Sequence, residues 1–275
     1  MASEADVAFT DVLNENPLSL SSEQITNYNE LGFVSPLEGF TTEDAAMNRE
    51  YFDSLLAQIP DESSYAINCY QARLAGLWDI CTNGRILDHV QDLIGENIVC
   101  WASHFFCKLP GDPKKVPWHQ DASFWHLSPT RTVTVWLAID DADETNSAMR
   151  FIPRTHRDGS LDTQSVSSDT VLALETKGIS DDVASFSNNL RAGQFSMHAD
   201  MLVHGSFPNN STRRRCGLTI RYCPAEVKIT NPAWAAGVES IICRGSDKSN
   251  KWRHFERPAD DVLVLNKVPV NVGGN

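Results

Sequence analysis

Amphipathic patterns of helical spacing occupy the first hundred positions of the chain. The segment SSEQ at residues 21–24 is typical of a helix start, because a serine and a glutamine three positions apart can pair with the free amides of a first turn. The segment TTED at residues 41–44 predicts a second start with an acidic first turn. Residues 86–94 repeat apolar side chains at helical spacing until Gly95. We therefore expect residues 1–96 to form helices that buttress a sheet.

From residue 97 onward the pattern changes to short segments rich in β-branched and aromatic residues. Turn clusters such as PGDP at 110–113 and PNNS at 208–211 separate them. The expected strands cover residues 98–109, 118–125, 130–140, 148–153, 171–176, 194–204 and 216–223. Helices first and strands later predict a mainly β α+β fold. A jelly roll or related barrel fits best, because its narrow interior holds one small ligand or metal.

The chain shows no linker and no internal repeat, so we interpret residues 1–275 as a single catalytic domain. Residues 97–225 are expected to form the jelly-roll core. Within it, residues 157–189 are polar and rich in Ser and Asp, which predicts an insertion or lid. Residues 226–275 form a C-terminal extension that the pattern does not place.

The net charge of −13 argues against a nucleic-acid or anionic-membrane partner. The basic patch Arg213-Arg214-Arg215 is too short for a nucleic-acid footprint. No apolar run is as long as a membrane span, and the acidic start lacks the features of a signal peptide, so we expect a cytoplasmic monomer or homodimer.

The cysteines indicate neither a disulfide framework nor a zinc site. They number seven and never occur as Cys-x-x-Cys, so we expect reduced thiols. They are Cys69, Cys81, Cys100, Cys107, Cys216, Cys223 and Cys243.

The segment WHQD at residues 118–121 carries the most informative chemistry. On a strand, His119 and Asp121 would point to the same face and present an imidazole and a carboxylate to one ion. His204 supplies a second imidazole at the end of an apolar segment. Two histidines and one carboxylate on one face of an octahedral ion are typical of non-haem iron(II) oxygenases. The three open positions suit a bidentate 2-oxo acid and dioxygen.

Several further motifs make residues 20–225 resemble the phytanoyl-CoA dioxygenase (PhyH) family, a branch of the Fe(II)/2-oxoglutarate-dependent oxygenases. They are KLPG at 108–111, WHQD at 118–121, TVWLAID at 134–140, SAMRFIPRTH at 147–156, and HGSFPNNS at 204–211 continuing to Arg215. The resemblance implies a double-stranded β-helix of the cupin-like jelly-roll type. It also implies Fe(II), 2-oxoglutarate and O2, with His119, Asp121 and His204 as catalytic metal ligands. Ser147 and Arg154 stand where the family often has glycine, so we expect those turns to differ.

The resemblance also assigns the cosubstrate pocket. The family holds the distal carboxylate of 2-oxoglutarate with an arginine eleven residues after the second histidine, which is Arg215. The alternation of side chains along the strand agrees with this assignment. The residues at positions 216, 218, 220 and 222 form an apolar face that suits packing on helices, so Arg215 is expected on the opposite face, toward the site. Ser206 is expected to support the cosubstrate, and Gln120, Trp136 and His104 to line the pocket. For these last three a purely structural role is left open.

Three further residues near the motifs have both a functional and a purely structural interpretation. His198 is a rival to His204 as metal ligand, since both fall on one nominal strand face. Phe124 and Trp125, directly after the metal motif, are candidates to border the substrate, with core packing as the alternative.

The implied function is hydroxylation of an unactivated C–H bond in a small metabolite, with 2-oxoglutarate and O2 converted to succinate and CO2. Asp121 favours this over halogenation, because relatives that halogenate lack the carboxylate. Two alternatives stay open: a cupin-type metalloenzyme without 2-oxoglutarate, and a non-catalytic β-sandwich binding module. Basic residues expected near the barrel mouth favour an anionic substrate such as a phosphonate or carboxylate. They are Lys108, Lys114, Lys115 and Arg150.

Overall fold

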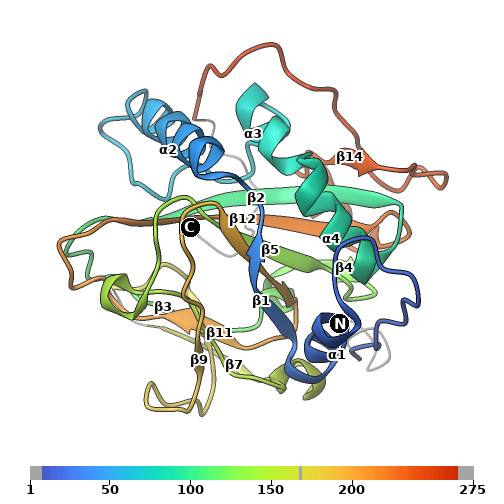
Figure 1. The fold of residues 1–275 in the computed structure, drawn as a ribbon, viewed down its shortest axis with the longest axis horizontal. Helices are drawn as coiled ribbons and strands as arrows, with labels where there is room; N and C mark the ends of the chain where they lie inside the picture. Colours follow the sequence, from blue (N-terminus) through green and yellow to red (C-terminus); the bar gives the residue numbers. More distant parts are fainter. Residues whose placement is uncertain (1–7, 167–168, 266–275) are drawn as a thin grey trace.

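The computed structural model describes residues 8–166 and 169–265, and its strands form two principal antiparallel sheets (Figure 1). The six-stranded sheet has the order β1 (Phe33–Glu38), β10 (Gln194–Ala199), β5 (Val133–Ala138), β12 (Arg215–Pro224), β2 (Ile98–Lys108) and β14 (Ile241–Arg244). The four-stranded sheet has the order β3 (Val116–His119), β11 (His204–Ser206), β6 (Arg150–Phe151) and β9 (Phe186–Ser187). This is the mainly β jelly roll that the sequence predicts.

Two short ribbons and several helices complete the fold. The ribbons pair β13 (Lys228–Ile229) with β4 (Leu127–Ser128), and β7 (Thr163–Ser165) with β8 (Leu174–Thr176). The α-helices are α1 (Ser22–Leu31), α2 (Thr42–Leu56), α3 (Ala75–Cys81), α4 (Gly84–Ile94) and α5 (Pro232–Ala235). Short 3-10 helices cover Asp121–Phe124, Glu144–Asn146 and Thr155–Arg157.

The predicted helix starts are confirmed by their caps. Ser21 and Gln24 form a reciprocal capping box at α1, and the Thr41 hydroxyl accepts the Asp44 amide of α2. Helix α4 ends at Gly95, as the apolar period predicts. Because each cap depends on residues three or four positions apart, a sequence pattern is sufficient to locate it.

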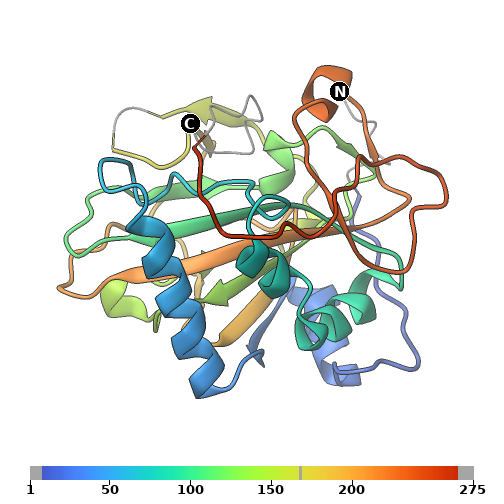
Figure 2. The ribbon, with the colours of Figure 1, turned by 90° about the horizontal axis from the view of Figure 1, so that it is seen from above.

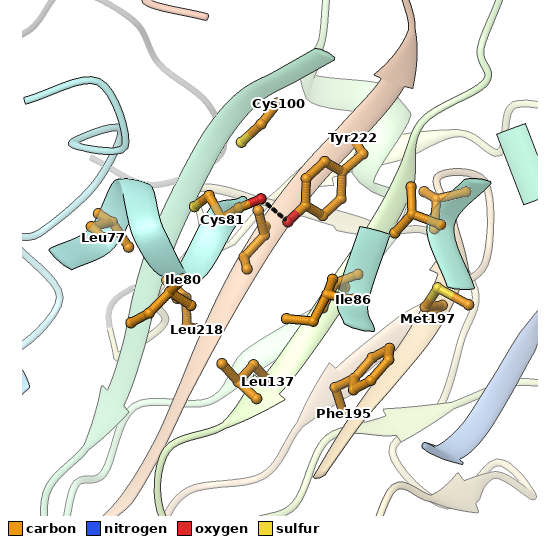
Figure 3. Packing of buried hydrophobic residues seen from close by; sticks show 14 of the residues in the cluster. Leu77, Ile80, Cys81, Ile86, Cys100, Leu137, Phe195, Met197, Leu218 and Tyr222 are labelled. Atoms are coloured by element: carbon orange, nitrogen blue, oxygen red, sulfur yellow. Dashed lines mark hydrogen bonds between the residues drawn. The ribbon is translucent and has the colours of Figure 1, made fainter. Parts of the chain in front are cut away.

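Helices α2, α3 and α4 cover one face of the six-stranded sheet (Figure 2). The apolar side chains of β12 predicted to face helices, such as Leu218 and Tyr222, belong to this core. Figure 3 shows them against Leu77, Ile80 and Cys81 of α3. The Tyr222 hydroxyl donates a hydrogen bond of 2.8 Å to the Cys81 carbonyl, which satisfies the one polar group that this ring buries.

Four segments contain strands or breaks that the sequence pattern did not predict. Residues 1–96 contain β1, an edge strand of the large sheet, in addition to helices, and residues 226–275 contribute β14 at the other edge. Residues 157–189 form β7, β8 and β9, and part of this segment joins the small sheet. The strand expected over residues 194–204 is divided into β10 and β11, which belong to different sheets. A turn between them carries the chain from one sheet to the other.

Within the residues described, no helix has the length and apolar character needed to cross a membrane.

Candidate metal centre and cosubstrate pocket

A pocket lies between the two sheets, and side chains from both sheets line it. Its wall combines three metal-ligand candidates, two arginines and a mostly apolar remainder. The lining residues are Phe106, Val116, His119, Asp121, Phe124, Trp136, Met149, Leu172, His204, Gly205, Ser206, Arg215, Thr219 and Arg221.

His119 and His204 face each other as cross-strand partners of β3 and β11. Their ring centroids lie 4.1 Å apart. Each ring is fixed by the carbonyl two residues before it: His119 Nδ1 lies 2.8 Å from the Pro117 oxygen, and His204 Nδ1 lies 2.9 Å from the Leu202 oxygen. Because a carbonyl can only accept, Nδ1 carries the proton and Nε2 of each ring keeps its lone pair for a metal.

Asp121 reaches the same point by a route that the sequence does not predict. Strand β3 ends at His119, and Asp121 begins a 3-10 helix instead of continuing the strand. The expectation that both residues lie on one strand face is therefore wrong, although their side chains do converge. Ligand atoms of His119, Asp121 and His204 all lie within 4.8 Å of one another, and all three residues are buried.

The Asp121 carboxylate is held ionised by its neighbours. Thr134 donates a hydrogen bond of 2.9 Å to Oδ2, and Arg221 Nη2 lies 3.8 Å from Oδ1. Burial alone would raise the pKa of Asp121, but Arg221, His119 and His198 hold it well below its usual range. Burial, together with His119 and His198, lowers the pKa of His204 well below its usual value. An anionic carboxylate with a neutral, oriented imidazole is a donor set that fits a divalent ion such as Fe(II).

Arg215 is a buried cation in the same pocket. Its guanidinium donates to the Ser147 carbonyl (2.9 Å), the Phe106 carbonyl (3.3 Å) and the Ser206 hydroxyl (3.1 Å). Within the described residues it has no carboxylate within 4.0 Å, although only 2% of the residue is exposed. A buried guanidinium bound only to neutral acceptors fits an anionic ligand, because its charge is otherwise uncompensated.

Trp136 forms the floor beneath this guanidinium. Its ring centroid lies 5.7 Å from Arg215 Cζ, and only 2% of the residue is exposed. Gly217 is required above the ring, since an added Cβ would lie 2.0 Å from Trp136 Cζ2. Trp136 and Ser206 both line the pocket, as the resemblance implies.

Comparison with known proteins agrees with this geometry. The profile of the phytanoyl-CoA dioxygenase (PhyH) family matches residues 37–217, which is more than half of the chain. The chain belongs to the phytanoyl-CoA dioxygenase family.

Relatives of this family member include two proteins named for phosphorus compounds. A probable alpha-ketoglutarate-dependent hypophosphite dioxygenase of Stutzerimonas stutzeri is 29% identical over 52% of this chain and 51% of the relative. A methylphosphonate hydroxylase of Gimesia maris is 25% identical over 52% of this chain and 60% of the relative. The matched stretch thus spans about half of each relative. The apo structure of the non-heme monooxygenase ThoJ shares the fold, with a TM-score of 0.75, 24% identity, and coverage of 86% of this chain and 88% of that one.

Two residues that the resemblance assigned to the pocket of a phytanoyl-CoA dioxygenase lie outside its lining. The Gln120 amide donates to the Gly159 and Met201 carbonyls, at 2.9 and 2.8 Å, and its oxygen accepts the Leu161 amide. His104 Nε2 lies 2.8 Å from the Tyr65 carbonyl. Gln120 therefore ties loops together, and a backbone carbonyl holds one ring nitrogen of His104.

Of the four basic residues expected at the barrel mouth, Lys108 lies in the interior. Lys108 is fully buried and donates to Ser147 Oγ at 3.2 Å and to the Phe207 carbonyl. Lys115 pairs with Asp181 at 3.3 Å, and Arg150 lies over the Phe207 ring. Lys108 is therefore not part of a basic entrance, and that Lys114, Lys115 and Arg150 belong to one stays a prediction.

The structure also places residues near the metal centre whose roles the sequence left open. His198 lies beside the cluster, with Nε2 3.6 Å from Asp121 Oδ2, but does not join the three-residue ligand group. Phe124 lines the pocket, whereas Trp125 packs edge-to-face on Trp101. Leu172, from the expected insertion, also lines the pocket.

Sequence reasoning did not single out Arg221 or Thr134, although the signal was present. Arg221 has the same parity on β12 as Arg215, and Thr134 has the same parity on β5 as Trp136. Extending the alternation along each strand would have placed both side chains in the site.

Proposed function

We propose that this chain is an Fe(II)/2-oxoglutarate-dependent dioxygenase that hydroxylates an unactivated C–H bond of a small metabolite. The observation that carries the proposal is the joint presence, in one pocket, of the His119, Asp121 and His204 ligand group and of the buried Arg215 without an acidic partner. Family membership supports it. We also propose that residues 1–275 act as one catalytic domain.

Each residue has a defined task in this proposal. His119 and His204 offer Nε2 lone pairs, and Asp121 offers one carboxylate oxygen, which leaves part of the coordination sphere free. Arg215 grips the distal carboxylate of 2-oxoglutarate with its planar fork, supported by the Ser206 hydroxyl. Trp136 excludes water from that ion pair. When bound, iron and 2-oxoglutarate supply dioxygen activation, with succinate and CO2 as coproducts.

The alternatives account for fewer of these features. A cupin-type metalloenzyme without 2-oxoglutarate would use the metal group but would leave Arg215 without a ligand. A β-sandwich binding module would require neither the oriented histidines nor the ionised Asp121. A buried, uncompensated guanidinium costs free energy on the order of a few kcal/mol. The oxygenase gives that charge a ligand.

We further propose a small anionic substrate, such as a phosphonate or carboxylate. The net charge of −13 gives no general attraction for anions, so a specific buried cation must supply it. Two relatives support this class of compound, since their names refer to hypophosphite and methylphosphonate.

Anaerobic titration with Fe(II) and 2-oxoglutarate tests the proposal. The wild type is expected to develop the weak visible charge-transfer band of a chelated 2-oxo acid, whereas His119→Ala and His204→Ala lose it with the metal. The variant His89→Ala, at a half-buried histidine that does not line the pocket, is the control. Retention of the full band in both ligand variants would show that the metal assignment is wrong.

Product mass in labelled dioxygen tests the reaction type once a substrate is found by screening for substrate-triggered succinate. With iron bound, Asp121 would fill the coordination position that a halide would need. In excess chloride we therefore expect an alcohol carrying one labelled oxygen. A chlorinated product from the wild type would contradict this role of Asp121, and a desaturated product would replace hydroxylation with another oxidation.

A further inference from the structure

A second buried arginine lies in the pocket, on the strand that carries Arg215. Arg221 is six residues further along the same face of β12, a distance on the order of 20 Å between Cα atoms at about 3.3 Å per residue. Only 3% of its side chain is exposed. The two arginines therefore lie toward opposite ends of the pocket, with the metal-ligand group also on its wall.

The hydrogen-bonding capacity of Arg221 is largely unused. Nε and Nη1 are buried and have no hydrogen-bond partner among the residues that the structure describes. Nη2 lies 3.8 Å from Asp121 Oδ1, which is an ionic contact but longer than a hydrogen bond. A buried guanidinium rarely leaves two donor nitrogens unsatisfied, so these donors point to a ligand that accepts from them.

Aromatic rings hold the guanidinium in place. Arg221 Cζ lies 5.2 Å from the Trp125 ring centroid and 6.0 Å from that of Trp101, and these two rings contact each other edge-to-face. The two flanking rings restrict the movement of the guanidinium, while its Nε and Nη1 hydrogens stay available. A carboxylate or a phosphonate has several acceptor oxygens and can accept from Nε on one edge of the guanidinium or from Nη1 on another.

The charges of the occupied site leave Arg221 without a counterion, and this step rests on the proposed function. Iron(II) is balanced by Asp121 and by the carboxylate of 2-oxoglutarate that chelates it, and the distal carboxylate is balanced by Arg215. Apart from Asp121, two ionisable groups near Arg221 are neutral: burial raises the pKa of Cys69 to about 11 and lowers that of His104 to about 3. One buried positive charge therefore remains.

We propose that Arg221 binds the anionic group of the substrate, an oxyanion such as a phosphonate or carboxylate, and so holds the substrate beside the metal centre. Phe124, which lines the pocket next to Asp121, gives the remainder of the substrate an apolar contact. In this arrangement Arg215 selects the cosubstrate and Arg221 selects the substrate.

The test uses the anaerobic complex of the full chain with Fe(II) and 2-oxoglutarate, with methylphosphonate as probe and acetate as the carboxylate arm. Binding is read from the shift of the charge-transfer band and from the rise in Tm. In the wild type we expect saturable binding of at least one anion and no response to the neutral dimethyl ester of methylphosphonate. A stronger response to methylphosphonate or to acetate identifies the oxyanion class.

Three variants separate a binding role from a structural one. Arg221→Gln is expected to weaken probe binding at least roughly 10-fold while changing the 2-oxoglutarate affinity less than about 3-fold. Arg221→Lys, which keeps the charge but loses the fork, should fall between wild type and Arg221→Gln. The surface variant Arg213→Gln should match the wild type.

Several outcomes would overturn the inference. Equal probe binding by wild type and Arg221→Gln would do so, as would a loss of iron or 2-oxoglutarate binding as large as the loss of the probe. If Arg221→Gln does not fold, equal binding of the anion and its neutral ester by the wild type would have the same meaning. A wild type without any charge-transfer band would refute the proposed function itself, whereas a normal band without an anion response refutes only the role of Arg221.

Discussion

Arg213 and Arg215 are two residues apart, yet their surroundings give them different chemistry. Arg213 is exposed and pairs with Asp143 at 2.6 Å, a contact that water and salt screen. Arg215 is buried among neutral acceptors beside Trp136. A carboxylate bound to Arg215 is shielded from water, so the same pair of charges attracts far more strongly there.

We predict that Arg215→Ala raises the KM for 2-oxoglutarate by a factor of roughly 30 or more, because truncating one partner of a desolvated pair costs about 2–5 kcal/mol. Arg213→Ala should change it less than about 2-fold. Succinate formation at varied 2-oxoglutarate measures both. Equal and mild effects of the two substitutions would show that Arg215 does not hold the cosubstrate.

At the scale of elements, two turns keep a left-handed backbone without glycine. Ser147 has φ of 73° and Arg154 has φ of 75°, at the two positions where the family often has glycine. The turns therefore have the shape that glycine favours, contrary to the expectation that they differ. Ser147 is held in that shape because its carbonyl accepts from Arg215 and its hydroxyl accepts from Lys108. Arg154 is exposed, and the hydrogen bonds at this residue involve its backbone: its amide donates to the Leu31 carbonyl, and its carbonyl accepts from the Arg157 amide.

We predict that Arg154→Gly raises the free energy of unfolding by about 0.5–1 kcal/mol. Glycine removes a strain of about 1–2 kcal/mol from the left-handed backbone. It also increases the conformational entropy of the unfolded chain, which offsets part of that gain in stability. Urea unfolding at pH 7 measures the change. Arg154→Ala keeps the Cβ and should stay within about 0.5 kcal/mol of wild type. A glycine variant no more stable than the alanine variant would argue against strain at this turn.

At the scale of the whole molecule, folding brings Lys108 and Arg215 together in the interior. Burial, and secondarily the Arg215 charge, lowers the pKa of Lys108 to about 6, far below the value of about 10.4 in an unfolded chain. Between these two values the unfolded chain binds more protons than the folded one. The free energy of unfolding contributed by this group therefore rises with pH across the window, and it is lowest below pH 6.

We predict that the stability of the metal-free wild type, measured relative to Lys108→Met, increases as pH rises from about 6 to 9. Methionine has a similar length and does not titrate, so the difference between the two unfolding curves isolates Lys108 from other groups. Urea unfolding at four or five pH values gives that difference. A difference that is constant or falls with pH would show that Lys108 stays charged in the folded protein.

The sequence by itself determined the features that depend on near neighbours. Helix caps such as Ser21 with Gln24 act within one turn, and strand parity on β12 separates Leu218 from Arg215 because side chains alternate strictly. The mainly β jelly roll followed from the spacing of the apolar segments. The motif around His119 and His204 was sufficient to name the ligand candidates.

Only the tertiary structure decided the features that depend on distant partners. The register of β3 against β11 sets His119 opposite His204, and a 3-10 turn, not a strand, delivers Asp121 between them. Lys108 became a buried amine with a lowered pKa, and Arg221 became an unsatisfied donor, because residues remote in sequence surround them. Burial and register arise from packing between elements, and a local pattern carries no information on which element will be the neighbour.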